Sequence, residues 1–225
     1  MAACCEPQGY DRIFSTRTAR RAAKRYRKSG LTWAPRRTAE LYSAGVITGQ
    51  TVLEIGGGIG DLQIELLRAG VERATSVELS PNYEQVADGL LGDAGLAGRS
   101  ERLVGDFATV PGLAQPADIV VLHSVVCCYP DPARLLEPAA RATRRHLVIS
   151  FPRESWWLRV WGAVENLYPW MRGSDARFIV HPEPNIVRPI ERAGLRRFHT
   201  EHNWVDHLAV FTREHRRQSR AENTS

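Results

Sequence analysis

The sequence predicts an α/β fold built on a doubly wound, mostly parallel sheet, and three observations carry this prediction. From residue 50 onward, short apolar runs alternate with amphipathic segments that are bounded by Gly or Pro. A glycine-rich turn from Gly56 to Gly60 joins the first apolar run to the first amphipathic segment. Residues 196–214, RRFHTEHNWVDHLAVFTRE, predict two antiparallel strands after the parallel ones.

Each element of the domain follows from its own pattern. Amphipathic stretches predict helices at 61–70, from Pro81 to about residue 91, at 131–143, and at 185–194. Proline lacks an N–H and clashes with the preceding turn, so Pro138 is expected to kink or split the helix in which it lies. Aromatic residues at helical spacing predict a further helix at 155–171. Apolar runs predict parallel strands at 51–55, 74–79, 101–107, 117–126 and 146–151.

A polar, arginine-rich segment precedes the domain. Residues 15–29 lack Gly and Pro and predict a helix that begins at Ser15 or Thr16 as N-cap and ends at Gly30. Residues 35–44 predict a second, short helix. The predicted organisation is therefore a basic helical arm at 1–45, an α/β domain at 46–212 with an insertion near 152–182, and a polar tail at 213–225.

The excess of positive over negative charge lies in this arm. The net charge is +5, and residues 10–37 hold ten basic groups against one acid, Asp11. Residues 38–225 hold 20 basic and 23 acidic groups. A basic arm on a slightly acidic body could tether a nucleic acid through its phosphates, or it could cover the site and guide an anionic substrate. The acidic body favours the second interpretation, so nucleic acid is not the expected partner.

The composition indicates a globular protein of the cytoplasm. Hydrophobic residues make up 43% of the chain, yet no apolar run approaches the ~18–20 residues of a membrane span. The first residues show no basic start followed by an apolar run, so no signal peptide is expected. The four cysteines form two adjacent pairs, Cys4-Cys5 and Cys127-Cys128, which do not resemble a secreted disulfide framework. The sequence does not specify an oligomeric state.

Acidic and aromatic residues follow the first three strands where a ligand of an open sheet would bind. The glycines at 56, 58 and 60 let the backbone approach a ligand closely, but Asp61 stands where the dinucleotide fingerprint requires its third Gly. Glu54 is a buried acid that must order the loop amides or hold a ligand cation. Glu78 ends the second strand at the distance expected of a ribose ligand, and Asp106-Phe107 could bind and stack an adenine.

These motifs resemble those of the class I S-adenosylmethionine-dependent methyltransferases over about residues 50–151. The resemblance implies a Rossmann-like, seven-stranded sheet whose last two strands form an antiparallel hairpin, and S-adenosylmethionine as cofactor. It implies that the glycine loop contacts the methionine moiety, that Glu78 with Leu79 binds the ribose, and that Asp106 and Phe107 bind the adenine. The residues implied to bind the cofactor are Glu54, Gly56, Gly58, Gly60, Glu78, Leu79, Asp106, Phe107 and His123.

The chain also resembles a narrower group, the magnesium-protoporphyrin O-methyltransferases and their relatives. The shared segments are GYDRIF and RYRKSGL in the arm, LHSVVCCYPD after the fourth strand, ISFPRESWW after the fifth, and an Arg-x3-His pattern at 177–181. Cys128 stands directly before Tyr129-Pro130, where the porphyrin enzymes carry His. This similarity implies a small-molecule acceptor that is aromatic or carries a carboxylate.

Three residues after the fourth strand are the candidates for catalysis. His123 ends that strand where the acceptor would lie, and Tyr129 and Cys128 follow in the same loop, with Ser124 as a further positioning candidate. A carboxylate or thiolate acceptor needs no base, whereas an alcohol or amine could use one. The structural alternatives are a histidine that caps the strand end and cysteines that pack in the core.

Aromatic and basic residues outside the parallel strands are the candidates for substrate binding. Aromatic rings could form the wall of a pocket for a flat acceptor, and basic side chains could pair with its carboxylates. For each of them, packing or surface solvation is the alternative. These candidates are Tyr10, Tyr26, Trp156, Trp157, Arg153, Arg177 and His181.

The sequence thus predicts a methyltransferase that acts on a small molecule by in-line displacement. A nucleic-acid methyltransferase that uses the basic arm is one alternative, but the fourth strand lacks the D/N-P-P-[YF] motif of amino-directed enzymes. The cysteine pairs leave a second alternative, methylation of a thiol or thiophilic substrate. Adjacent cysteines lack the C-x2-C spacing of zinc sites, so no metal is expected. A non-catalytic binding protein would not need Glu54, Glu78 and Asp106 together.

Overall fold

The computed structural model describes residues 14–110, 112–155 and 178–213 and contains one seven-stranded sheet in the order β3-β2-β1-β4-β5-β7-β6. Five strands are parallel, and β7 runs antiparallel to both β5 and β6. This arrangement confirms the predicted fold class, including the C-terminal hairpin. The strands are β1 (Thr51–Ile55), β2 (Arg73–Glu78), β3 (Ser100–Val104), β4 (Ala117–His123), β5 (Thr143–Pro152), β6 (Leu195–His202) and β7 (Asp206–Arg213).

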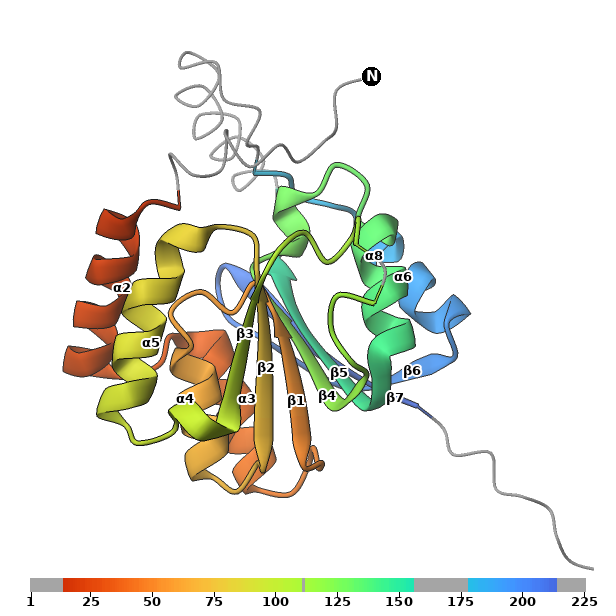
Figure 1. The fold of residues 1–225 in the computed structure, drawn as a ribbon. Helices are drawn as coiled ribbons and strands as arrows, with labels where there is room; N and C mark the ends of the chain where they lie inside the picture. Colours follow the sequence, from red (N-terminus) through yellow and green to blue (C-terminus); the bar gives the residue numbers. More distant parts are fainter. Residues whose placement is uncertain (1–13, 111, 156–177, 214–225) are drawn as a thin grey trace, which may run out of the picture.

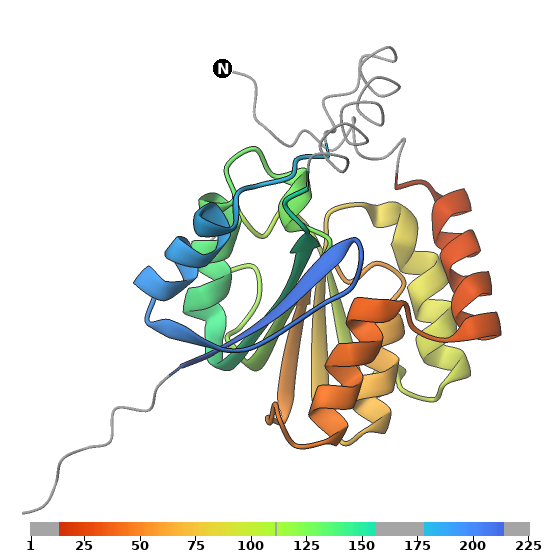
Figure 2. The same cartoon turned by 180° about the vertical axis from the view of Figure 1, so that it is seen from behind.

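Helices cover both faces of the sheet (Figure 1). One face carries α2, α3, α4 and α5, and the other carries α6 and α8, as the view from behind also shows (Figure 2). The α-helices are α2 (Thr16–Ser29), α3 (Trp33–Ser43), α4 (Asp61–Arg68), α5 (Glu84–Asp93), α6 (Ala133–Ala142) and α8 (Glu183–Arg192). Three single-turn 3-10 helices, η1 (Pro81–Tyr83), η2 (Ala97–Arg99) and η3 (Val126–Cys128), lie in the connections.

The core is divided between the two faces because successive side chains of a strand point in opposite directions. On β4, Val120 and Leu122 pack in the cluster beneath α6 and α8, whereas Ile119 and Val121 pack in the cluster beneath α3 and α4. All four of these side chains are fully buried. The central strands are therefore apolar on both faces, which is why their sequences read as continuous runs.

Several element boundaries differ from the sequence predictions. β3 ends at Val104, before Phe107, and β4 ends at His123 because the backbone at Ser124 takes a φ of 57° that no strand can continue. Pro138 lies inside α6, which is one helix and is not split. Burial of the apolar face of α6 in the core offsets the hydrogen bond that this proline cannot donate. The helix predicted at 155–171 lies outside the described residues.

The N-terminal helix is anchored on the body. α2 has the predicted bounds, with Ser15 as N-cap and Gly30, at a φ of 72°, as C-cap. Its small residues Ala19 and Ala23 are buried, and it packs against α5 and η1. Two polar contacts fix it: the Tyr26 hydroxyl donates to Glu65 Oε1 on α4 at 2.5 Å, and Arg27 pairs with Asp93 on α5 at 2.8 Å.

The outward face of α2 is strongly basic. All seven of its Arg and Lys side chains are exposed, and only Arg27 has an ion pair with another described residue. The excess positive charge of the sequence is therefore concentrated on the exposed surface of α2. The exposed cations are Arg17, Arg20, Arg21, Lys24, Arg25, Arg27 and Lys28.

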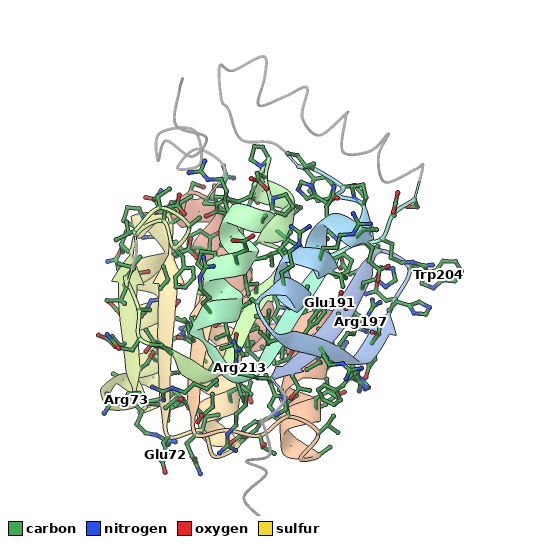
Figure 3. The ribbon with its side chains drawn as sticks, turned by 90° about the vertical axis from the view of Figure 1, so that its right-hand side faces the viewer. Glu72, Arg73, Glu191, Arg197, Trp204 and Arg213 are labelled. Carbon is green, nitrogen blue, oxygen red and sulfur yellow. The ribbon has the colours of Figure 1, made fainter. Side chains whose placement is uncertain are left out.

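The hairpin edge is tied to the helices of its face by one arginine. Arg213, labelled in Figure 3, donates to the carbonyl oxygens of Thr143, Ala140 and Ala193 at 2.9, 2.7 and 3.1 Å. These oxygens lie at the end of α6 or the start of β5 and just after α8, so one guanidinium joins three elements. At the other end of the hairpin, Trp204 projects into solvent and is 88% exposed.

Candidate active site

A cavity of about 350 Å³ opens at the carboxyl ends of β1, β2 and β4, the edge at which ligands of doubly wound sheets bind. It has the size and mixed lining of a small-molecule site. The residues that line it are Phe14, Arg25, Ile55, Gly56, Gly58, Val77, Glu78, Leu79, Tyr83, Gly105, Phe107, His123, Ser124, Val125, Cys128 and Tyr129.

The glycine loop forms the floor of this cavity. Gly56, Gly58 and Gly60 have φ values of 75°, 49° and 75°, in the left-handed region that favours glycine. Gly56 is also crowded, since a Cβ atom there would lie 2.4 Å from Val125 Cγ2. Gly60 begins α4 as its N-cap, so the amides at the start of α4 face the loop.

Glu78 projects from the end of β2 into the cavity. Its Oε2 accepts from the Gly58 amide at 2.9 Å, and its Oε1 accepts from the Ser80 amide at 3.1 Å. Burial raises the pKa of this carboxyl group, and the two amide donors act in the opposite direction. A carboxylate held by two amides has lone pairs left over for further donors, such as a pair of hydroxyl groups.

Arg102 lies beneath the loop, and its role was not predicted from the sequence. Its guanidinium donates to both carboxylate oxygens of Glu84 at 2.9 and 2.7 Å and to the Gly58 carbonyl at 2.8 Å. The side chain is only 6% exposed. Arg102 therefore fixes the carbonyl of the same glycine whose amide Glu78 holds, so the two side chains orient the peptide groups on either side of Gly58.

We expect Arg102→Lys to lower the free energy of unfolding by about 1–3 kcal/mol, because lysine cannot form the fork to Glu84 and still reach Gly58. Urea denaturation measures this loss. The matched control is Arg68→Lys, since Arg68 is 54% exposed where it pairs with Glu65, and such a pair contributes about 0–1 kcal/mol. Equal losses in the two variants would contradict the assigned role of Arg102.

Glu54 lies below the loop and does not line the cavity. It is 5% exposed, and burial raises the pKa of its carboxyl group well above the usual range. A Cβ atom on Gly57 would lie 3.1 Å from Glu54 Oε2 and 2.3 Å from Ser76 Oγ. The loop backbone thus packs directly on these two side chains, and the position of Glu54 favours loop support over direct contact with a ligand.

The residues after β3 enclose one end of the cavity. Phe107 lines the cavity, whereas Asp106, also predicted to bind the adenine, is not among the residues that line it. Asp106 Oδ1 accepts from the Ala108 amide at 2.9 Å and from the Tyr129 hydroxyl at 2.7 Å. The Tyr129 bond joins the loop after β3 to the loop after β4, so two residues that the sequence predicted for different roles are brought together.

His123 is held on both sides of its ring. Its Nε2 lies 3.0 Å from Thr38 Oγ1 and its Nδ1 lies 3.1 Å from Ser150 Oγ. The Thr38 hydroxyl donates to the Ala34 carbonyl, so we assign the proton to Nε2 and make Nδ1 the acceptor from Ser150. Burial lowers the pKa of His123 to about 3. These contacts make His123 a neutral residue that fixes the end of β4 between α3 and β5.

This environment predicts a pH dependence of stability. The unfolded chain binds a proton on this His below about pH 6.5, whereas the folded chain does not until about pH 3, so stability falls as the pH is lowered through this window. We expect a contribution of about 1 kcal/mol per pH unit. Denaturation of wild type and His123→Gln between pH 7 and 5 measures it. Identical slopes in the two proteins would contradict the assignment.

The loop after β4 combines backbone strain with two thiols. Ser124 is the one non-glycine residue with a positive φ in the described part of the chain. Cys127 is buried and donates to the Ser124 carbonyl at 3.3 Å, and Cys128 lines the cavity. The proximity of the two thiols lowers the pKa of Cys128 and raises that of Cys127.

Other candidate residues lie apart from the cavity. Tyr26 anchors α2 through Glu65, His181 Nε2 lies 2.8 Å from the Tyr129 carbonyl, and Arg153 donates to the Asn203 carbonyl at 3.2 Å. Leu79, by contrast, is one of the residues that line the cavity. Outside the described residues lie Tyr10, Trp156, Trp157, Arg177, Cys4 and Cys5.

Several cavity residues were missed by the sequence analysis, and three of them come from segments outside the predicted motifs. Phe14 and Arg25 come from the arm, and Tyr83 comes from η1. The Phe14 and Tyr83 rings lie 6.2 Å apart, and the Phe14 carbonyl accepts from Ser80 Oγ at 3.0 Å. The arm helix was predicted, but no periodicity tells which of its seven cations points toward the glycine loop.

The described part of the chain holds neither a candidate metal-binding cluster nor a helix that could span a membrane. Residues 14–110, 112–155 and 178–213 contain no cluster of three or more His, Cys, Asp or Glu side chains that could hold a metal ion. In the same ranges, every helix is too short or too polar to cross a membrane.

Comparison with known proteins agrees with this site. Residues 53–149 match the family model described as a methyltransferase domain. No curated protein matches the chain. The matched segment runs from β1 to β5 and so includes the glycine loop, Glu78 and the loop after β4.

Solved structures share the fold at low sequence identity. Magnesium protoporphyrin IX methyltransferase from Synechocystis PCC 6803, solved with bound SAH, is 20% identical, with a TM-score of 0.63 over 90% of this chain and 85% of that one. An O-methyltransferase family 2 protein from Planctomyces limnophilus, in complex with apigenin, is 19% identical, with a TM-score of 0.65 over 88% and 62%. The (4+2)-cyclase SpnF is 13% identical, with a TM-score of 0.59 over 79% and 80%.

Proposed function

We propose that this chain, whose residues 53–149 form a methyltransferase domain, binds S-adenosylmethionine and transfers its methyl group to a small-molecule acceptor. The observation that carries the proposal is the position of Glu78, a carboxylate at the end of β2 that faces the same cavity as the glycine loop. This pairing suits a ligand with a nucleoside at one end, whose ribose hydroxyls reach Glu78, and a polar amino-acid moiety at the other.

The lining suggests how the cofactor lies. Glu78 accepts the two ribose hydroxyls, Phe107 packs against the adenine with Asp106 behind it, and the loop from Gly56 to Gly60 faces the methionine moiety. The sulfonium then points toward the loop after β4. The Synechocystis enzyme, which shares the fold of this chain, was solved with bound SAH, and this supports the cavity as the cofactor site.

The chemistry is a displacement at the methyl carbon. A nucleophile of the acceptor forms the new bond to carbon while the carbon–sulfur bond breaks, and its electron pair stays on sulfur, which becomes a neutral thioether. The protein aligns the two partners and excludes water. The loop with Ser124, Cys128 and Tyr129 bounds the space where the acceptor would lie.

The same loop bears on the kind of acceptor. Among the described cavity residues, His123 has both ring nitrogens in hydrogen bonds and a pKa of about 3, and the Tyr129 hydroxyl donates to Asp106. Neither is suited to remove a proton at neutral pH. Of the three candidate catalytic residues this leaves Cys128, which also lines the cavity. We favour an acceptor that is already anionic, such as a carboxylate, because its methylation releases no proton and needs none of the three as a base.

Binding and transfer must both be measured, because the fold of this chain also occurs in a (4+2)-cyclase. Calorimetry should show S-adenosylhomocysteine binding to the purified chain. A screen of carboxylic acids with radiolabelled S-adenosylmethionine should then yield a labelled ester that base hydrolyses. Absence of S-adenosylhomocysteine binding would refute the proposal, and binding without transfer to any small molecule would refute its catalytic part.

The nucleic-acid alternative keeps one specific observation, the seven exposed cations of α2. In that case RNA would bind with an affinity that falls steeply with salt, and RNA would become labelled in the transfer assay. The small-molecule proposal predicts no label in RNA.

A further inference from the structure

One cation reaches the cofactor cavity, and it comes from the arm. Among the described residues that line the cavity, Arg25 is the only Arg or Lys and Glu78 is the only Asp or Glu. The two charges are contributed by different parts of the chain, since Glu78 ends β2 and Arg25 lies in the last two turns of α2. The cavity therefore presents both an acidic and a basic group to its ligand.

The neighbours of Arg25 hold the helix in place and leave its own side chain available. Tyr26 donates to Glu65, and Arg27 pairs with Asp93. Arg25 has no ion pair with a described residue, although it lies close enough to Asp61 to counteract the rise that burial causes in the pKa of Asp61. Asp61 is the first residue of α4, directly after the glycine loop. The guanidinium is thus near the loop end of the cavity.

We infer that Arg25 binds the α-carboxylate of the cofactor's methionine moiety, an inference that rests on the proposed cofactor. The proposed cofactor has its ribose at Glu78 and its amino-acid end over the glycine loop. Its single carboxylate then lies at the loop end of the cavity, where Arg25 is found. A guanidinium pairs with a carboxylate through two parallel hydrogen bonds, which lysine cannot reproduce. Arg25 is in this view a cofactor-binding residue.

The inference also gives the arm a role. Phe14 and Arg25 both line the cavity, and they lie at the two ends of the segment that packs on η1 and α5. A ligand that pairs with Arg25 would stabilise α2 in its docked position, so that cofactor binding and arm docking support each other.

Two ligands separate this role from a general effect on the site. S-adenosylhomocysteine carries the carboxylate, and 5′-methylthioadenosine has the same adenosine and thioether sulfur but lacks the amino-acid end. Calorimetry of Arg25→Gln should show S-adenosylhomocysteine affinity reduced by about 10- to 100-fold, with 5′-methylthioadenosine affinity unchanged within about 2-fold. Arg25→Lys should lie between wild type and Arg25→Gln. The matched control, Arg21→Gln, removes an exposed cation one turn earlier that does not line the cavity, and should leave both affinities unchanged.

Each other outcome overturns the inference in a distinct way. Equal losses for both ligands would mean that Arg25 supports the site without touching the carboxylate. Unchanged S-adenosylhomocysteine affinity in Arg25→Gln would mean that the guanidinium faces another anion, such as the acceptor. If wild type binds neither ligand, the proposed cofactor is wrong and this inference falls with it.

Discussion

Glu78→Gln is expected to weaken S-adenosylhomocysteine binding by about 100-fold, or about 2.7 kcal/mol, because hydrogen bonds to a charged acceptor each contribute about 1.5–3 kcal/mol. The carboxylate already accepts the Gly58 and Ser80 amides through its two oxygens. Glutamine has one oxygen and one NH2 group, so one of these amides loses its acceptor. We therefore also expect a loss of about 1–2 kcal/mol in the free energy of unfolding.

Calorimetry and urea denaturation of the same samples separate the two effects. The control is Glu101→Gln, the same change at an exposed position on the neighbouring strand β3, which should alter neither quantity by more than about 0.5 kcal/mol. The role assigned to Glu78 would be contradicted if Glu78→Gln bound S-adenosylhomocysteine as wild type does. A loss of stability at unchanged affinity would reduce Glu78 to a support of the glycine loop.

The parts of the fold predictable from sequence are those set by local patterns. β1 has the predicted bounds because Thr51–Ile55 is an apolar run closed by glycine, and α2 has them because Ser15 and Gly30 cap it. The side-chain motifs follow the carboxyl ends of the parallel strands, and in a parallel sheet these ends all lie at the same edge. Glu78 and Phe107 could therefore be brought to one cavity without knowledge of the tertiary structure.

The parts that could not be predicted depend on contacts between distant segments. Arg102 reaches Gly58 from β3, and Thr38 reaches His123 from α3. Nothing in the spacing of these residues distinguishes them from ordinary strand and helix positions. His123 is an example of what the sequence leaves out. The sequence places this residue at the site, but only its contacts with Thr38 and Ser150 show that its ring is neutral and fixed.

Gly56→Ala tests the most crowded point of the loop, and it is expected to destabilise the fold by about 2–5 kcal/mol and to abolish measurable S-adenosylhomocysteine binding. Two costs add. The first is backbone strain, since a φ of 75° costs an L-residue about 1–2 kcal/mol. The new Cβ atom would also lie 2.4 Å from Val125 Cγ2, an overpacking that typically costs about 1–3 kcal/mol. Because Val125 lines the cavity, its displacement also changes the shape of the cofactor site.

Two further variants separate these costs. Gly95→Ala has nearly the same backbone strain, with a φ of 70°, but no atom within 4 Å of its Cβ position, so it should show the first cost alone and bind S-adenosylhomocysteine normally. Gly56→Ala with Val125→Ala removes the clashing methyl group, and it should be less destabilised than the two single changes added together. If Gly56→Ala costs no more than Gly95→Ala, then Val125 yields without penalty and the close approach of the two loops does not shape the cavity. Strict additivity in the double variant would lead to the same conclusion, because the excess cost of Gly56→Ala could not then arise from its contact with Val125.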